Sequence, residues 1–190
     1  VNLLKGKQGT KVEVEIVRAD KKDPFKVTMI RDTIKLEMVE DKMLDGQIGY
    51  VSLLKFGTNT GDELRKHILK LQAQGMKGLI LDLRSNPGGS LKEAQDISSL
   101  FIKEDMVVYL KYKNGQEVKY NRTAQNLGDF PLIVLVNGGS ASASEIVTGA
   151  IKDYKRGLII GQKTFGKGIV QEIMPLSQGD ALKLTIAQYF

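Results

Sequence analysis

The sequence contains no cysteine and only one histidine. Without cysteine the chain can form no disulfide, has no thiol nucleophile and cannot build a zinc site on cysteine ligands. The single histidine, His67, stands beside Leu64 and Ile68 in a helical pattern, which is typical of a residue that borders a packed helix face. We therefore expect the chemistry of this chain to depend on neither cysteine nor histidine.

Long runs of one residue type are also missing. No stretch approaches the roughly 18 consecutive apolar residues of a membrane span, and the first residues lack the charged-then-apolar order of a signal peptide. Basic residues exceed acidic ones by 28 − 22 = 6, but other residues interrupt the basic clusters at 5–11 and 152–156. Interrupted clusters are typical of solvated surface, so nucleic acid is not an expected partner.

What is present is an alternation of two patterns from residue 33 onward. The chain has 190 residues, 42% of them hydrophobic, which is enough for one sizeable core. Near-continuous apolar runs, which suit strands buried on both faces, occupy residues 48–56, 78–84, 132–137 and 157–161. Helical periodicity separates them at residues 64–71, 91–101 and 146–154. This order predicts an α/β fold with a largely parallel sheet and flanking helices.

Hairpin patterns at residues 107–120 and 168–190 depart from this alternation and predict that the sheet is mixed. The first turns at Asn114-Gly115 and the second at Gln178-Gly179-Asp180. The first 32 residues hold two amphipathic strands, at 12–16 and 25–29, and are too few for a domain. We expect them to end a preceding domain, and we expect the core of residues 33–190 to continue past residue 190.

Three clusters of small residues follow buried strands. They are SNPGGS at 85–90, NGGSASASE at 137–145 and GQKTFGKG at 161–168. Ligands of open α/β sheets bind at the carboxyl ends of the strands, so the clusters are predicted to meet at one crevice.

The third cluster resembles a phosphate-binding P-loop in spacing. Gly161, Gly166 and Lys167 have the required separation, but Gly168 stands where the magnesium-binding serine or threonine belongs. A P-loop must also open a helix, whereas β-prone residues follow here. We therefore expect no nucleotide and no other cofactor, and Lys167 needs another role.

The second cluster places Ser140, Ser142 and Ser144 between a strand and a helix. A serine at such a turn can expose its hydroxyl while the next N–H points at developing negative charge. The alternative is structural, because Ser142 and Glu145 have the spacing of a capping box. Spacing does not choose between these readings or among the three serines.

The first and third clusters could supply a serine with its partners. Gly88 and Gly89 either form a tight turn or bring a backbone N–H to an oxyanion. A lysine can replace histidine as the base where burial lowers its pKa from about 10.4 toward 7–8. Lys167 has such a setting, because it is flanked by glycines between apolar strands.

The strings DLRSNPGG, NGGSASASEI and TFGKGIVQ, in this order, closely resemble the C-terminal processing peptidases, or tail-specific proteases, which use a Ser-Lys dyad. The resemblance implies that Ser142 is the nucleophile, Lys167 the base and Gln171 the residue that orients the lysine. It also implies that backbone N–H groups of Ala143 and Gly88 form the oxyanion hole. A straight strand would separate Lys167 and Gln171 by about 13 Å, so their contact requires a bend near Gly168.

The resemblance carries further expectations. It implies a layered core similar to the crotonase and ClpP folds over residues 33–190, and it implies that residues 1–32 are the C-terminal part of a PDZ domain. The substrate would be an extended or partly unfolded polypeptide bound near its C-terminus, in the extracytoplasmic envelope of a bacterium, with no metal. A homo-oligomer and a membrane anchor outside this segment are compatible with it. The rival reading is a non-catalytic peptide-binding module, in which the serines are caps.

Overall fold

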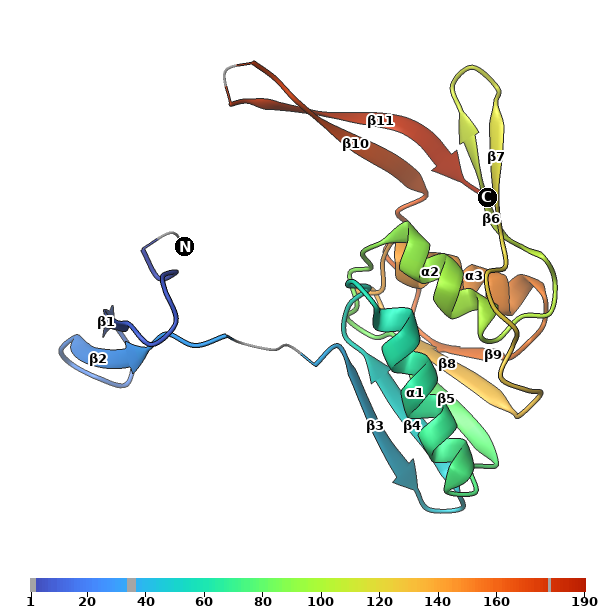
Figure 1. The fold of residues 1–190 in the computed structure, drawn as a ribbon, viewed down its shortest axis with the longest axis horizontal. Coiled ribbons are helices and arrows are strands. Elements are labelled where there is room, and N and C mark those ends of the chain that lie inside the picture. Colours follow the sequence, from blue (N-terminus) through green and yellow to red (C-terminus); the bar gives the residue numbers. More distant parts are fainter. Residues whose placement is uncertain (1–2, 34–36, 178) are drawn as a thin grey trace. The chain divides into compact units, whose positions relative to one another are not determined.

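The structure, a computed structural model, describes residues 3–33, 37–177 and 179–190 and divides into two compact units (Figure 1). The first unit, Val1–Glu37, contains an antiparallel hairpin of β1 (Lys11–Ile16) and β2 (Phe25–Ile30). Residues of β1 alternate between half-buried and exposed. The two predicted amphipathic strands are therefore confirmed.

The second unit, Met38–Phe190, is built on a five-stranded sheet of order β3-β4-β5-β8-β9. Its strands are β3 (Val39–Leu44), β4 (Ile48–Leu53), β5 (Gly78–Asp82), β8 (Leu132–Val136) and β9 (Leu158–Gly161). The β3–β4 pair is antiparallel and the other pairs are parallel. The predicted mixed, largely parallel sheet is confirmed.

Three helices connect the parallel strands: α1 (Thr60–Ala73), α2 (Leu91–Ser99) and α3 (Ala143–Asp153). Each parallel strand lies next to its predecessor in the same direction, so right-handed crossovers place the helices on one face of the sheet. In Figure 1, α2 lies between α1 and α3, and it contacts both. The core therefore lies between this helical layer and one face of the sheet.

The register shows which strand residues meet the helices. Val51, Leu81, Val134 and Ile159 are paired in one row, and the first three are fully buried. The adjacent row of Tyr50, Ile80, Ile133 and Leu158 points to the opposite face, and Leu158 is 66% exposed. The expectation that these strands are buried on both faces is therefore wrong for this second face, because the helices that cross over all lie on the first.

A second sheet, of order β10-β11-β6-β7, is antiparallel. Its strands are β6 (Met106–Tyr112), β7 (Glu117–Asn121), β10 (Ile169–Pro175) and β11 (Ala181–Tyr189). Both predicted hairpins are confirmed, but they form this separate sheet, and the five-stranded sheet is mixed because β3 pairs antiparallel with β4. Gly115 adopts φ 83° in the first turn, and the second predicted turn includes Gln178, which lies outside the described residues.

In the described ranges no helix is long and apolar enough to cross a membrane.

Candidate active site

The three small-residue clusters meet at the carboxyl ends of β5, β8 and β9, as predicted. Asn86 O accepts hydrogen bonds from Ala141 N at 3.0 Å and from Ser144 Oγ at 3.0 Å. Phe165 N donates to Ser140 O at 3.0 Å. These bonds join the first cluster to the second and the second to the third, so they define one site.

Geometry separates the three serines of the second cluster. Ser140 and Ser144 are fully buried, and their hydroxyls donate to the carbonyls of Leu83 at 2.7 Å and Asn86 at 3.0 Å. Ser142 is half-buried and lines a cavity. Only Ser142 of the three has a positive φ, 55°, a left-handed backbone region that costs a non-glycine residue about 1–3 kcal/mol.

Glu145 links the Ser142 turn to the Lys167 loop. Its Oε2 accepts from the N–H groups of Ser142 at 2.8 Å and Lys167 at 2.9 Å. Its Oε1 accepts from the Thr164 hydroxyl at 2.8 Å and Gly166 N–H at 2.6 Å. Burial opposes ionisation of this carboxyl, but the four donors hold the pKa of Glu145 below its ordinary value. Sequence reasoning treated Glu145 only as a helix cap and missed this link.

A cavity of about 540 Å³ contains both members of the predicted dyad. Ser142 and Lys167 line it together with residues of α3, β6 and the end of β11. In the described part of the chain no hydrogen bond joins Ser142 Oγ to Lys167 Nζ. Catalytic hydrogen bonds are often longer in a ligand-free enzyme and shorten when substrate binds.

Tyr189 is a neighbour of Ser142 that sequence reasoning did not identify. Burial raises the pKa of the Tyr189 phenol, and the nearby Ser142 hydroxyl opposes that rise. Tyr189 N donates to Gly168 O at 3.0 Å, which holds the end of β11 against the Lys167 loop. The only signal in the sequence was the amphipathic pattern of the last strand, which gave no reason to place this residue at the serine.

The two predicted oxyanion donors lie next to each other. An added Cβ at Gly88, whose φ is 91°, would lie 2.8 Å from Ala143 N, so only glycine allows this approach. Ala143 N–H, at the start of α3, has no acceptor among the described residues. Gly88 N–H donates to Asn86 Oδ1 at 2.9 Å. To serve as an oxyanion donor, it must give up this bond and donate to the oxyanion.

Gln171 is not brought to the predicted dyad. It lies on β10 next to a bulge between Val170 and Gln171, and its Nε2 donates to Thr185 Oγ1 at 3.4 Å. The chain does turn near Gly168, whose N–H donates to Gly166 O at 3.1 Å. The orienting role of Gln171 therefore stays a prediction.

Comparisons with known proteins show which family the chain belongs to. A model described as Peptidase family S41 matches residues 47–190. The chain belongs to peptidase family S41. It is 38% identical over 190 residues to a carboxyl-terminal-processing protease of Synechocystis sp., covering 98% of this chain and 44% of that protein. It is 40% identical over 190 residues to the carboxy-terminal processing protease CtpA of Bacillus subtilis, covering 100% and 41%.

Among solved structures, the photosystem II D1 C-terminal processing protease superposes with a TM-score of 0.74 at 31% identity. The match covers 97% of this chain and 52% of that one. This S41 chain spans less than half the length of the Synechocystis and Bacillus subtilis proteases.

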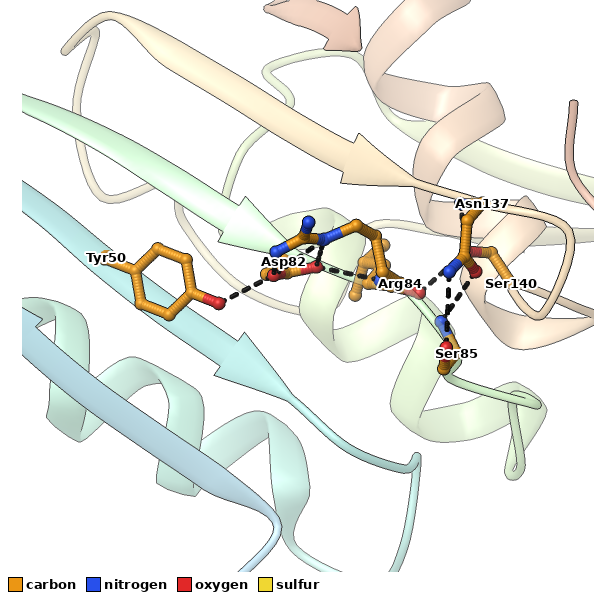
Figure 2. A network of polar contacts seen from close by, with 7 residues as sticks. Tyr50, Asp82, Arg84, Ser85, Asn137 and Ser140 are labelled. Carbon is orange, nitrogen blue, oxygen red and sulfur yellow. Dashed lines mark hydrogen bonds and ion pairs between the residues drawn. The ribbon is translucent and has the colours of Figure 1, made fainter. Parts of the chain in front are cut away.

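Figure 2 shows a polar network of this S41 chain at the carboxyl ends of β5 and β8, which Tyr50 joins from β4. The Tyr50 hydroxyl donates to Asp82 Oδ2 at 2.6 Å, and Arg84 Nε donates to Asp82 Oδ1 at 2.9 Å. Asp82 is buried, which opposes its ionisation, but Arg84 and Tyr50 keep the pKa of Asp82 below its ordinary value. Beside it, Asn137 Oδ1 accepts from Ser85 N at 2.7 Å, so the first two clusters are joined on this side too.

The alternative chemistries find no support in the S41 fold. Lys167 is followed by strand β10 rather than by a helix, so GQKTFGKG does not have the structure of a P-loop. His67 lies on α1, where its Nδ1 contacts Asp41 Oδ1, and it does not line the cavity. Within the described ranges no three His, Asp or Glu side chains come together as a metal site.

Proposed function

We propose that this chain is the catalytic core of a serine endopeptidase that cuts polypeptides near their C-termini. One observation carries the proposal. Ser142, with its strained backbone at the start of α3, lines the same cavity as Lys167, and Glu145 binds the backbones of both. The relatives that are named as carboxyl-terminal-processing proteases support the assignment.

The proposed reaction is an acyl transfer. Ser142 Oγ attacks the scissile carbonyl as its proton passes to Lys167 Nζ, and the C–N bond breaks as Lys167 Nζ gives that proton to the leaving amine. Water, deprotonated by Lys167, then releases the acyl group from Ser142. Ala143 N–H donates to the oxyanion. Gly88 N–H donates to it as well, once its hydrogen bond to Asn86 Oδ1 has broken.

The finer expectations of the resemblance remain part of this proposal. They include the orienting role of Gln171, the crotonase-like and ClpP-like layering, and the PDZ origin of residues 1–32. The substrate is an extended or partly unfolded polypeptide, and the place of action is outside the cytoplasm of a bacterium. The hairpin of β1 and β2, which lies in the first unit, is compatible with the end of a PDZ domain.

The test is cleavage of unfolded casein by the wild type and by the variants Ser142→Ala and Lys167→Ala. Both variants should lose at least about 10³-fold in rate while their thermal unfolding stays close to that of the wild type. Lys163→Ala, which removes an exposed lysine from the same loop, is the matched control and should cleave normally. If wild type binds casein without cutting it, the chain is a peptide-binding module.

A further inference from the structure

Tyr189 lies on the inner face of β11, close to the proposed dyad. Residues two positions apart in a strand point to the same face, and Ala187, two residues before Tyr189, is buried. The Tyr189 side chain is half-buried, packs against the hydrophobic core and lines the cavity that contains Ser142 and Lys167. It is therefore directed into the proposed active site.

The end of β11 that carries Tyr189 is held from both sides. On one side, Tyr189 N donates to the carbonyl oxygen of Gly168, the residue after Lys167, at 3.0 Å. On the other side, Phe190 exchanges two hydrogen bonds with Tyr109 of β6, at 2.9 and 3.0 Å, and the two rings stack with centroids 5.2 Å apart. A side chain on such a strand is placed more precisely than one on a loop. Tyr189 thus has the fixed position that is needed to orient another group.

The hydroxyls of Tyr189 and Ser142 are near enough to affect each other. Burial raises the pKa of the Tyr189 phenol, the Ser142 hydroxyl opposes that rise, and Tyr120 of β7 adds to it. Because the net shift is upward, the phenol keeps its hydrogen at neutral pH. A neutral phenol can donate one hydrogen bond while its oxygen accepts others.

A nucleophile and its base need a third group that orients them. Gln171, the residue expected for that task, donates to Thr185 Oγ1 instead. A serine hydroxyl rotates about its C–O bond, so its hydrogen faces the base consistently only if another group binds the oxygen. The position of Tyr189 allows it to be that group.

We propose that Tyr189 is a positioning residue whose phenol donates a hydrogen bond to Ser142 Oγ, which leaves the Ser142 hydrogen directed toward Lys167 Nζ. The inference rests on the proposed function, because it takes Ser142 as the nucleophile and Lys167 as the base. The phenol keeps its own proton throughout. The Ser142 proton passes to Lys167 Nζ as Oγ attacks, and the hydrogen bond from Tyr189 stabilises the negative charge that develops on Oγ before the new C–O bond is complete.

Tyr189→Phe tests this role, because it removes the phenol oxygen and keeps the ring. We expect kcat for casein cleavage to fall about 10- to 100-fold while KM stays within about twofold. Labelling of Ser142 by a small fluorophosphonate should slow by the same factor as kcat. Tyr112→Phe, at a half-buried site of β6 outside the cavity lining formed by the described residues, is the matched control and should behave as the wild type.

Two results would overturn the inference and leave the protease assignment intact. The first is a wild-type kcat and labelling rate for Tyr189→Phe. The second is a rise in KM at unchanged kcat, because that change indicates lost substrate binding and not a misplaced Ser142 hydroxyl.

A double-mutant cycle tests the contact itself and needs no catalysis. Thermal midpoints are measured for the wild type, Tyr189→Phe, Ser142→Ala and the double variant. If the two hydroxyls are hydrogen-bonded, Tyr189→Phe should lower the midpoint by at least about 1 °C more in the wild type than in Ser142→Ala. Equal shifts in the two backgrounds contradict the inference, whether or not the wild type cleaves casein.

Discussion

At the scale of single residues, Glu145 is the group on which the geometry of the site depends most. Each of its oxygens accepts two hydrogen bonds, and the donors come from both the Ser142 turn and the Lys167 loop. A carboxylate can accept all four because it carries no hydrogen of its own. An amide cannot, since its nitrogen would face two donors.

Replacing Glu145 by glutamine should therefore loosen the Lys167 loop. We expect the free energy of unfolding to fall by about 2 kcal/mol, because the glutamine NH₂ group would face two hydrogen-bond donors that now bind a carboxylate oxygen. We expect kcat to fall about 10²-fold from misplacement of Lys167, with a smaller change in KM. Urea titration and casein kinetics measure the two effects. Glu172→Gln, at an exposed position of β10, should change neither, and equal behaviour of the two variants would contradict the linking role.

The lowered pKa of Glu145 predicts a dependence of stability on pH. The carboxylate stabilises the folded protein fully above its ordinary pKa of 4.5, and this contribution is lost as pH falls through the lowered value. The wild type should thus exceed Glu145→Gln in unfolding free energy at pH 7, and the gap should narrow below pH 4.5. Urea unfolding at pH 7, 5 and 3.5 tests this. If the difference in unfolding free energy between the two proteins does not change with pH, the charge of Glu145 is not the source of the extra stability.

At the scale of elements, buried side chains of one element satisfy backbone groups of another. Asn86, fully buried, donates its Nδ2 to Leu53 O at 2.6 Å and accepts from Gly88 N at 2.9 Å. Glu93 lies in the first turn of α2, where its N–H donates to Ser90 Oγ at 3.4 Å. Its carboxylate accepts from Asn59 N and Gly61 N at the start of α1, where Asn59 provides no side-chain cap.

Asn86→Ala should remove the link between the end of β4 and the glycine turn. Two buried backbone groups lose their partners, so we expect the free energy of unfolding to fall by about 3 kcal/mol. Cleavage should also weaken, because the Asn86 side chain fixes the turn that carries Gly88 to the end of β4. Differential scanning calorimetry gives the first value. Asn121→Ala, at an exposed site of β7, is the control. If Asn86→Ala loses no more unfolding free energy than Asn121→Ala does, this account is contradicted.

The sequence predicts those parts of the fold whose residues fit one physical pattern. The strands β5 and β8 are continuous apolar runs, and both were predicted. Strand β3 was not, because Asp41 occupies a core-facing position, where it pairs with His67 and Lys70, and so breaks the apolar alternation. The meeting of the small-residue clusters followed from their positions after strands. The linking roles of Glu145 and Asn86 could not be predicted from the sequence, because most of their partners are distant in the chain.

At the scale of the whole molecule, the two units differ in how much core they hold. The first has one hairpin, β1 and β2, and a two-stranded hairpin taken by itself is only marginally stable. The second contains the buried hydrophobic cluster of the protein. The units should therefore open independently.

Hydrogen exchange followed by mass spectrometry should show this difference. Amides of β1 and β2 should exchange at least about 100-fold faster than those of β5 and β8, because opening the hairpin exposes little apolar surface. The parallel strands provide the internal reference. Equal protection of both units would mean that another part of the protein covers the hairpin.

The assignment of Ser142 and Lys167 as nucleophile and base is tested most directly by covalent labelling. The protein is treated with a peptide fluorophosphonate, a serine-directed reagent, and the modified residue is located by mass spectrometry of its digest. The account predicts a single adduct on Ser142, formed at least about 10²-fold more slowly in Lys167→Ala. An adduct on Ser140 or Ser144, or labelling of Ser142 at an unchanged rate in Lys167→Ala, would contradict it.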